Sequence, residues 1–127
     1  MTAQTWAFVN VAFAGLLGAA GVALAAVAAH RVADPSLTSA ALFLILHAAA
    51  VIAISAFAGS SPWPSALLGI ASLMLFAVTL FSGDVSARVL LEGRLFPMAA
   101  PLGGSLMILS WAAVALVGLA AAVRGVS

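Results

Sequence analysis

The chain contains no cysteine, no lysine and no tyrosine, and four arginines and three acidic residues are its only charged side chains. The lack of cysteine excludes disulfides, thiolate nucleophiles and cysteine-ligated metal sites. Charged residues make up 6 % of the chain, against about 25 % in an ordinary soluble domain, so a water-soluble globular protein is excluded. The net charge of +1 is too small to indicate nucleic-acid binding, and we expect no nucleic-acid partner.

Hydrophobic residues, by contrast, make up 66 % of the chain. They form four apolar runs over about residues 6–29, 37–58, 65–82 and 101–123, and each is within the about 17–25 residues that cross a bilayer as a helix. Lipid offers no hydrogen-bond partner to the backbone, so each run should be helical. The sequence therefore predicts an all-α membrane protein, an antiparallel bundle of four transmembrane helices forming one domain over 1–127.

The first run could instead be a cleaved signal peptide. It is not preceded by a charged side chain, and it is longer than the about 7–15 residues of a signal-peptide core. We therefore expect a retained span. Pro35 separates it from the second run, for which Ser36 is the expected N-cap.

Arginine counting predicts the orientation. Four spans place both termini on one side, where the only arginine is Arg124. The opposite side has two charged loops, 30–35 and 83–100, which together hold three arginines. Because arginine is enriched in cytoplasmic loops, we expect these loops in the cytoplasm and both termini outside.

His47 is the leading candidate for a functional residue, because polar groups inside a membrane are rare and functional by default. It lies about eleven residues into the second run, or about 16 Å deep at 1.5 Å per residue. It could be a proton-relay, ligand-binding or cofactor position, or a neutral imidazole bonded to a neighbouring helix. Ser72 and Ser110 have a similar depth and could supply that bond.

Two further polar residues belong to the first run. His30 ends it, and the antiparallel arrangement separates His30 from His47 by about 15 Å in depth. A shared haem or metal ion is therefore not expected, and we expect no cofactor and no metal. Asn10 lies about one turn into the run and could bond another helix, a subunit or a lipid headgroup.

The break after the third run holds a charged pattern. Asp84, Arg88 and Glu92 are spaced i, i+4, i+8, so both acidic residues could pair with Arg88 if this segment is helical. It would then be an interfacial turn or an extension of the third helix. Its charges would be solvated, orient a cytoplasmic partner, or form a mouth over the bundle.

Small residues favour close helix packing in lipid. Gly103 and Gly104 open the fourth run and predict close approach of another backbone, from the end of the first or the third helix. Gly15, Gly18 and Gly21 recur in the first run, and Gly118 and Ala122 pair in the fourth. These small residues serve packing inside the bundle or docking of another protein.

Several short motifs resemble the domain of unknown function 423 family, small bacterial membrane proteins with relatives in animals. Phe81-Ser82-Gly83 closes the third run, and Pro101-Leu102-Gly103-Gly104 and Ser110-Trp111 belong to the fourth. Ala28-Ala29-His30 and Leu46-His47-Ala48 resemble the two histidine motifs of the family. The resemblance implies a four-helix membrane protein of the bacterial inner membrane, with no established activity.

The chain departs from that family in its tyrosines. The family often has a tyrosine shortly before the second histidine, where Phe43 is the nearest aromatic residue, and another at the position of Ser86. Chemistry that uses those tyrosines is not expected.

We expect a protein that is not an enzyme. The loops are short, and the sequence shows no set of nucleophile, base and orienting residue. The leading hypothesis is an accessory or stabilising subunit of a larger membrane complex, in contact with lipid and with other membrane subunits or copies of itself. The alternative is a small oligomeric transporter or channel with His47 as its polar group. A membrane enzyme or redox subunit would need a cofactor on His30 or His47.

Overall fold

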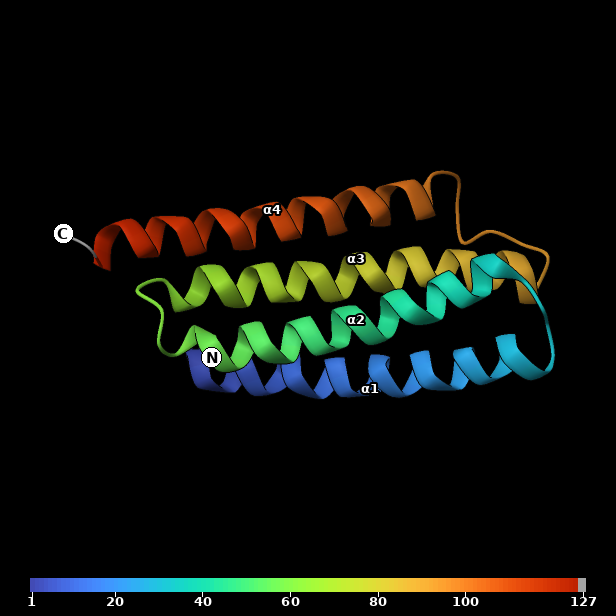
Figure 1. Ribbon diagram of the computed structural model, residues 1–127, viewed down its shortest axis with the longest axis horizontal. Helices are drawn as coiled ribbons and strands as arrows, with labels where there is room; N and C mark the ends of the chain where they lie inside the picture. Colours follow the sequence, from blue (N-terminus) through green and yellow to red (C-terminus); the bar gives the residue numbers. More distant parts are fainter. Residues whose placement is uncertain (126–127) are drawn as a thin grey trace.

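The computed structural model describes residues 1–125, and within this range the chain forms four helices and no strands (Figure 1). Each helix is long and apolar enough to cross a membrane. The predicted all-α, four-span fold is therefore confirmed. The helices are α1 Ala3–His30, α2 Pro35–Ala58, α3 Pro64–Leu90 and α4 Ala99–Gly125.

The third helix is longer than its apolar run. It continues past residue 82 to Leu90, so the connection to α4 is only 91–98 rather than the predicted 83–100. Asp84 and Val85 are buried, which shows that the extension packs inside the bundle. Glu92 and Met98 have positive φ angles of 54° and 72°, so a left-handed residue lies near each end of the connection.

The start of α2 differs by two residues from the prediction. Asp34 is the N-cap, because its Oδ1 accepts the Ser36 backbone N–H at 2.7 Å. Pro35 occupies the first helical position, where its missing N–H costs nothing. The prediction of Ser36 as the cap was wrong because an acidic side chain before a proline caps as well as a serine after it.

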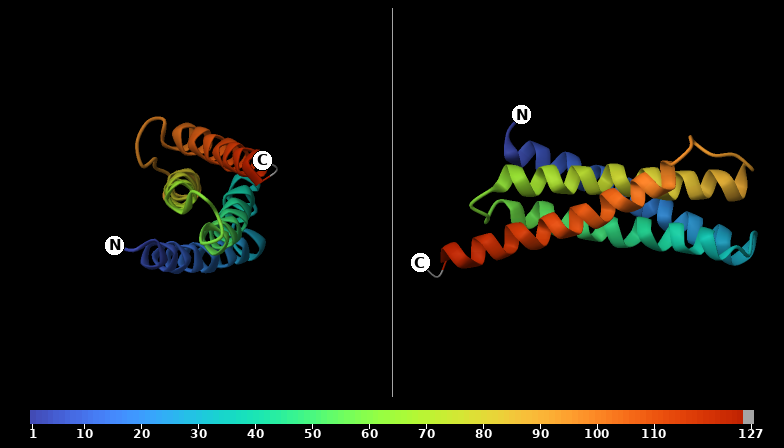
Figure 2. Two further views of the ribbon diagram at one scale, coloured as in Figure 1. Left: turned by 90° about the vertical axis from the view of Figure 1, so that its left-hand side faces the viewer. Right: turned by 90° about the horizontal axis from the view of Figure 1, so that it is seen from above.

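Consecutive helices run antiparallel, so both termini lie at the same end as the turn 59–63 (Figure 1). The connections 31–34 and 91–98 lie at the other end. Seen along the bundle, α1 and α4 lie on opposite sides of α2 and α3 (Figure 2). Among the described residues, α4 approaches only α3 closely, backbone to backbone, whereas α1 contacts both α2 and α3. The fold is thus a three-helix core with α4 laid against one of its members.

Two glycines set the closest helix contacts. A Cβ atom on Gly103 of α4 would lie 2.6 Å from the backbone N of Phe81 and 2.7 Å from the carbonyl O of Ala77, both in α3. A Cβ on Gly21 of α1 would lie 2.9 Å from the Cβ of Leu44 in α2. Only glycine permits these approaches. The close contact predicted at Gly103 is therefore present, and its partner is the third helix.

Candidate functional site

The most prominent polar contact in the membrane interior joins His47 of α2 to Trp111 of α4. His47 is buried. Its Nδ1 lies 2.8 Å from the carbonyl oxygen of Phe43, one turn earlier. The indole Nε1–H of Trp111 donates to Nε2 of His47 over 3.2 Å. Both ring nitrogens therefore have a partner.

These two partners determine which tautomer of His47 is present. A carbonyl oxygen can only accept, so Nδ1 must carry a proton. An indole N–H can only donate, so Nε2 must be unprotonated. The contacts select the neutral imidazole with its proton on Nδ1, and a second proton on Nε2 would break the bond to Trp111.

Ser72 and Ser110, the two residues whose depth could have supplied a partner, do not bind His47. Ser110 donates to the carbonyl of Leu106 in its own helix, and Ser72 contacts Asn10. Equal depth did not bring these side chains together because they lie on helix faces turned elsewhere. The bond that exists joins α2 to α4, two helices whose backbones are not in close contact.

A cavity of about 340 Å³, here called the His47 cavity, lies beside this contact between α2, α3 and α4. Gly104 lines it because a glycine leaves room opposite Phe81. Its only buried polar side chain is His47, and both nitrogens of that ring are already bonded. The cavity therefore suits an apolar group. Its lining residues are Phe43, His47, Phe81, Gly104, Met107, Ile108 and Trp111.

Asn10 belongs to a second polar link, between α1 and α3. Its Nδ2 donates to the carbonyl oxygen of Leu68 at 3.1 Å. The hydroxyl of Ser72 lies 2.8 Å from Asn10 Oδ1, and Trp6 Nε1–H donates to that hydroxyl at 2.9 Å. Asn10 is buried. Of the three partners considered for it, another helix, a subunit or a lipid headgroup, the structure shows another helix.

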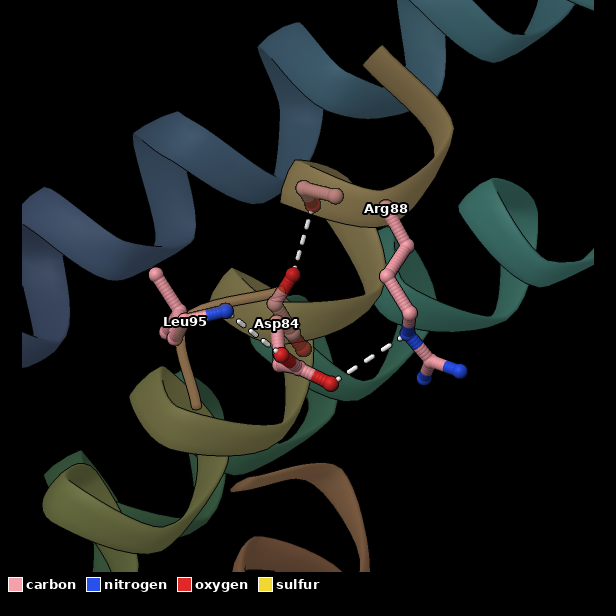
Figure 3. A network of polar contacts seen from close by, with 5 residues as sticks. Asp84, Arg88 and Leu95 are labelled. Atoms are coloured by element: carbon pink, nitrogen blue, oxygen red, sulfur yellow. Dashed lines mark hydrogen bonds and ion pairs between the residues drawn. The ribbon is translucent and has the colours of Figure 1, made fainter. Parts of the chain in front are cut away.

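Asp84 and Arg88 form a third polar site at the end with the charged connections (Figure 3). Asp84 is 2 % exposed. Its Oδ1 accepts the backbone N–H of Leu95 at 2.9 Å, and its Oδ2 lies 3.2 Å from Nε of Arg88. Glu92 lies past the end of α3, so the helical spacing predicted for an Arg88–Glu92 pair does not extend to it. The Asp84 carboxylate thus holds the connection 91–98 against α3. Because Asp84 is buried, this charged cluster is not a fully solvated face.

His30 is exposed at the end of α1, remote from His47 in the middle of α2. Within residues 1–125, no three histidine, aspartate or glutamate side chains gather closely enough to hold a metal ion. The predicted candidates thus separate into distinct places. His47 and Gly104 line one cavity, and Gly103 forms the close contact between α4 and α3. Asp84 and Arg88 form an ion pair. Asn10 and His30 lie apart from these places and from each other.

Sequence reasoning missed Trp111 as the partner of His47, although a signal was present. His47 and Trp111 lie equally far from the first residues of their helices, Pro35 and Ala99. Both helices start at the same end of the bundle, so the two residues share a depth. A buried imidazole nitrogen needs a donor, and an indole N–H at the same depth supplies one.

Comparison with protein-family models finds one that is described as a protein of unknown function (DUF423), and it matches residues 17–104. The match extends from the middle of α1 to the first turns of α4, so it includes His30, His47, Asp84 and Gly103. No curated protein and no solved structure matches the chain.

Proposed function

The chain belongs to the DUF423 family of proteins of unknown function, and we propose that it is a non-catalytic accessory or stabilising subunit of a larger membrane complex. Its four apolar helices make it a multi-pass membrane protein in contact with the lipid bilayer. An accessory subunit of this kind would meet its protein partner through part of its lipid-facing surface.

The polar contacts of the interior support a structural role. The Asn10 network joins α1 to α3, the Ser82 hydroxyl donates to the Ala40 carbonyl of α2 at 2.9 Å, and Trp111 bonds His47. Interhelical hydrogen bonds of this kind hold helices in register within lipid. These polar groups already have hydrogen-bond partners inside the bundle, so we expect a protein partner to bind on its outer surface.

The observation that carries the proposal concerns the C-terminal half of α4, after Ser110. Ser110 is the last buried residue of this helix within the described range. Beyond it, no atom of another described helix lies within 4 Å of the place that a Cβ on Gly118 would take, and Ala122 follows one turn later. This small-xxx-small face is the type at which membrane helices pack, and within the described residues the bundle leaves it uncovered.

A purification in polymer nanodiscs at native expression, followed by mass spectrometry, tests the proposal. We expect a stoichiometric membrane-protein partner that is lost in Gly118→Leu. The matched control is Gly15→Leu, which also places a side chain in open space but on α1. A wild-type particle that contains this chain alone would rule out the accessory role.

A second candidate function is transport by an oligomer, and the cavity beside His47 favours it. An apolar solute could occupy that space if Trp111 swung away from the ring. Flux through proteoliposomes should then fall in His47→Ala and persist in Ser105→Ala, whose hydroxyl bonds only its own helix. Equal flux in the wild type and His47→Ala would dismiss transport through this site.

We further propose that the protein lies in a bacterial inner membrane with the connections 31–34 and 91–98 in the cytoplasm. The arginine bias supports this orientation. The chain has no cysteine, so single cysteines can be labelled without background. Glu92→Cys should react with an impermeant maleimide only after the cells are opened, and Ser61→Cys should react in intact cells.

A further inference from the structure

A second cavity, here called the Ser55 cavity, opens at the end of the bundle that holds both termini. Its volume is about 470 Å³, within the range of about 300–1,000 Å³ typical of ligand pockets. It lies between α1, the end of α2 and the start of α3. Its lining residues are Ala3, Gln4, Ala7, Phe8, Val11, Ser55, Ala56, Ala58, Gly59, Pro64 and Leu68.

Ser55 is the unusual residue of this cavity. It is 4 % exposed, and its hydroxyl has no hydrogen-bond partner. Five other serines in these helices behave differently, because each donates to the carbonyl four residues earlier: Ser39, Ser72, Ser86, Ser105 and Ser110. Burying a hydroxyl without a hydrogen-bond partner is unfavourable, so this one calls for an acceptor from outside the chain.

The shape of the Ser55 cavity suits a chain-like apolar molecule. Ala3, Ala7 and Val11 recur every fourth residue on α1, so the cavity extends along this helix for about 12 Å. Two small alanines on that face leave the space open. The floor is buried at Ala58 and Leu68, whereas Gln4 at the first turn of α1 is exposed.

The depth of Ser55 identifies the polar group that would meet it. Helix α2 has 24 residues and a length of about 36 Å, about 3 Å longer at each end than a hydrocarbon core of about 30 Å. Ser55 is three residues before the end of α2 at Ala58, or about 5 Å below it. Its hydroxyl therefore lies near the edge of the hydrocarbon, where the ester groups of membrane glycerolipids lie.

We infer that the Ser55 cavity binds one ester-linked diacyl glycerolipid of the bilayer. One acyl chain lies along α1 between Ala7 and Leu68. The Ser55 hydroxyl donates to an ester carbonyl oxygen, and the headgroup remains at the exposed rim near Gln4. This site is separate from the outer face of α4, and the isolated chain can test it whether or not a protein partner exists.

The test uses native mass spectrometry of the full chain reconstituted with equal amounts of a diacyl ester lipid and its dialkyl ether analogue. The ether lipid has the same tails and no carbonyl oxygen. We expect one retained lipid per chain and about two- to fivefold enrichment of the ester form, as one hydrogen bond in lipid gives. Ser55→Ala should abolish the preference, and Ser39→Ala, on the same helix, should keep it.

A cavity-filling variant tests occupancy without removing any hydrogen bond. Ala7→Leu should lose the retained lipid, and Ala12→Leu, exposed on the same helix, should keep it. Equal retention in Ala7→Leu and the wild type would overturn the inference, as would an ester preference that survives Ser55→Ala. A photo-crosslinker at Gln4 that joins a protein segment and no lipid would also overturn it.

Discussion

The His47 cavity and the Ser55 cavity each have one buried polar side chain in the wall, and the two side chains are in opposite states. His47 has a partner for each ring nitrogen, Phe43 on its own helix and Trp111 on another. Ser55 has none for its hydroxyl. Similar apolar surroundings thus hold one satisfied and one unsatisfied group.

This difference separates two uses of polarity in a membrane bundle. A polar group that already has its partners links helices and fixes their register, as His47 does for α2 and α4. A polar group with space beside it and no partner is open to a ligand, as Ser55 is. Polar residues in a hydrophobic sequence are therefore better sorted by their hydrogen-bond state than by depth alone.

The largest expected effect comes from Gly103, whose lack of a side chain places α4 beside the His47 cavity. Gly103→Val would push its side chain into the backbone at Ala77 and Phe81, and should destabilise the protein by about 1–3 kcal/mol. Unfolding titrated with denaturing detergent measures this. Gly118→Val, in open space, is the control, and equal stability of the two variants would contradict the close contact between α4 and α3 at Gly103.

A smaller effect is expected at Asn10, which holds α1 against α3 near the Ser55 cavity. Asn10→Leu removes the donor to Leu68 O and the acceptor for Ser72, and should cost about 1–2 kcal/mol. The same unfolding assay applies. Gln4→Leu, a polar-to-apolar change at an exposed position of the same helix, should have little effect. An Asn10 variant as stable as the Gln4 variant would show that the network does not hold α1.

Trp111→Phe tests the His47 bond by keeping an aromatic ring and removing the N–H. It leaves Nε2 without a donor and should cost about 1 kcal/mol. In a double-mutant cycle with His47→Leu, the second change should cost less than it does alone. The ¹⁵N spectrum of the wild type should show His47 protonated on Nδ1 and unprotonated on Nε2. The opposite tautomer would contradict the assigned bonds.

The smallest expected effect sharpens the contrast between paired and unpaired hydroxyls. In lipid-free detergent, Ser55→Ala should leave stability unchanged or slightly raised, because it removes an unpaired buried group. Ser82→Ala removes the bond to Ala40 O and should cost about 0.6 kcal/mol. A loss at Ser55 as large as that at Ser82 would mean that the Ser55 hydroxyl has a partner within the chain.

The sequence predicted the helices better than their ends. Apolar runs locate spans because the hydrocarbon thickness imposes a length on each. They did not locate the end of α3, since Asp84 looks like a residue for a loop until its carboxylate is seen to bind the N–H of Leu95. A buried acid with partners is compatible with a helix, and composition does not reveal partners.

The candidate site was predicted in part for the same reason. His47, Asn10 and Gly103 were predicted as candidates because polar and small residues are conspicuous in an apolar chain. Trp111 was missed as a partner because tryptophan is also apolar. Ser55 was missed because serine ordinarily bonds its own helix, and only the folded structure shows that this one does not.

A four-span membrane protein with both termini at one end, and a close helix contact at Gly103, could be predicted from the order of the amino acids. These features follow from hydrophobicity, run length and residue size, which are local properties. Three features required the packed bundle: α4 lies beside α3, Trp111 bonds His47, and Ser55 faces a cavity without a partner. Each of these depends on how helices rotate about their axes, and a rotation is set by packing between segments far apart in the chain.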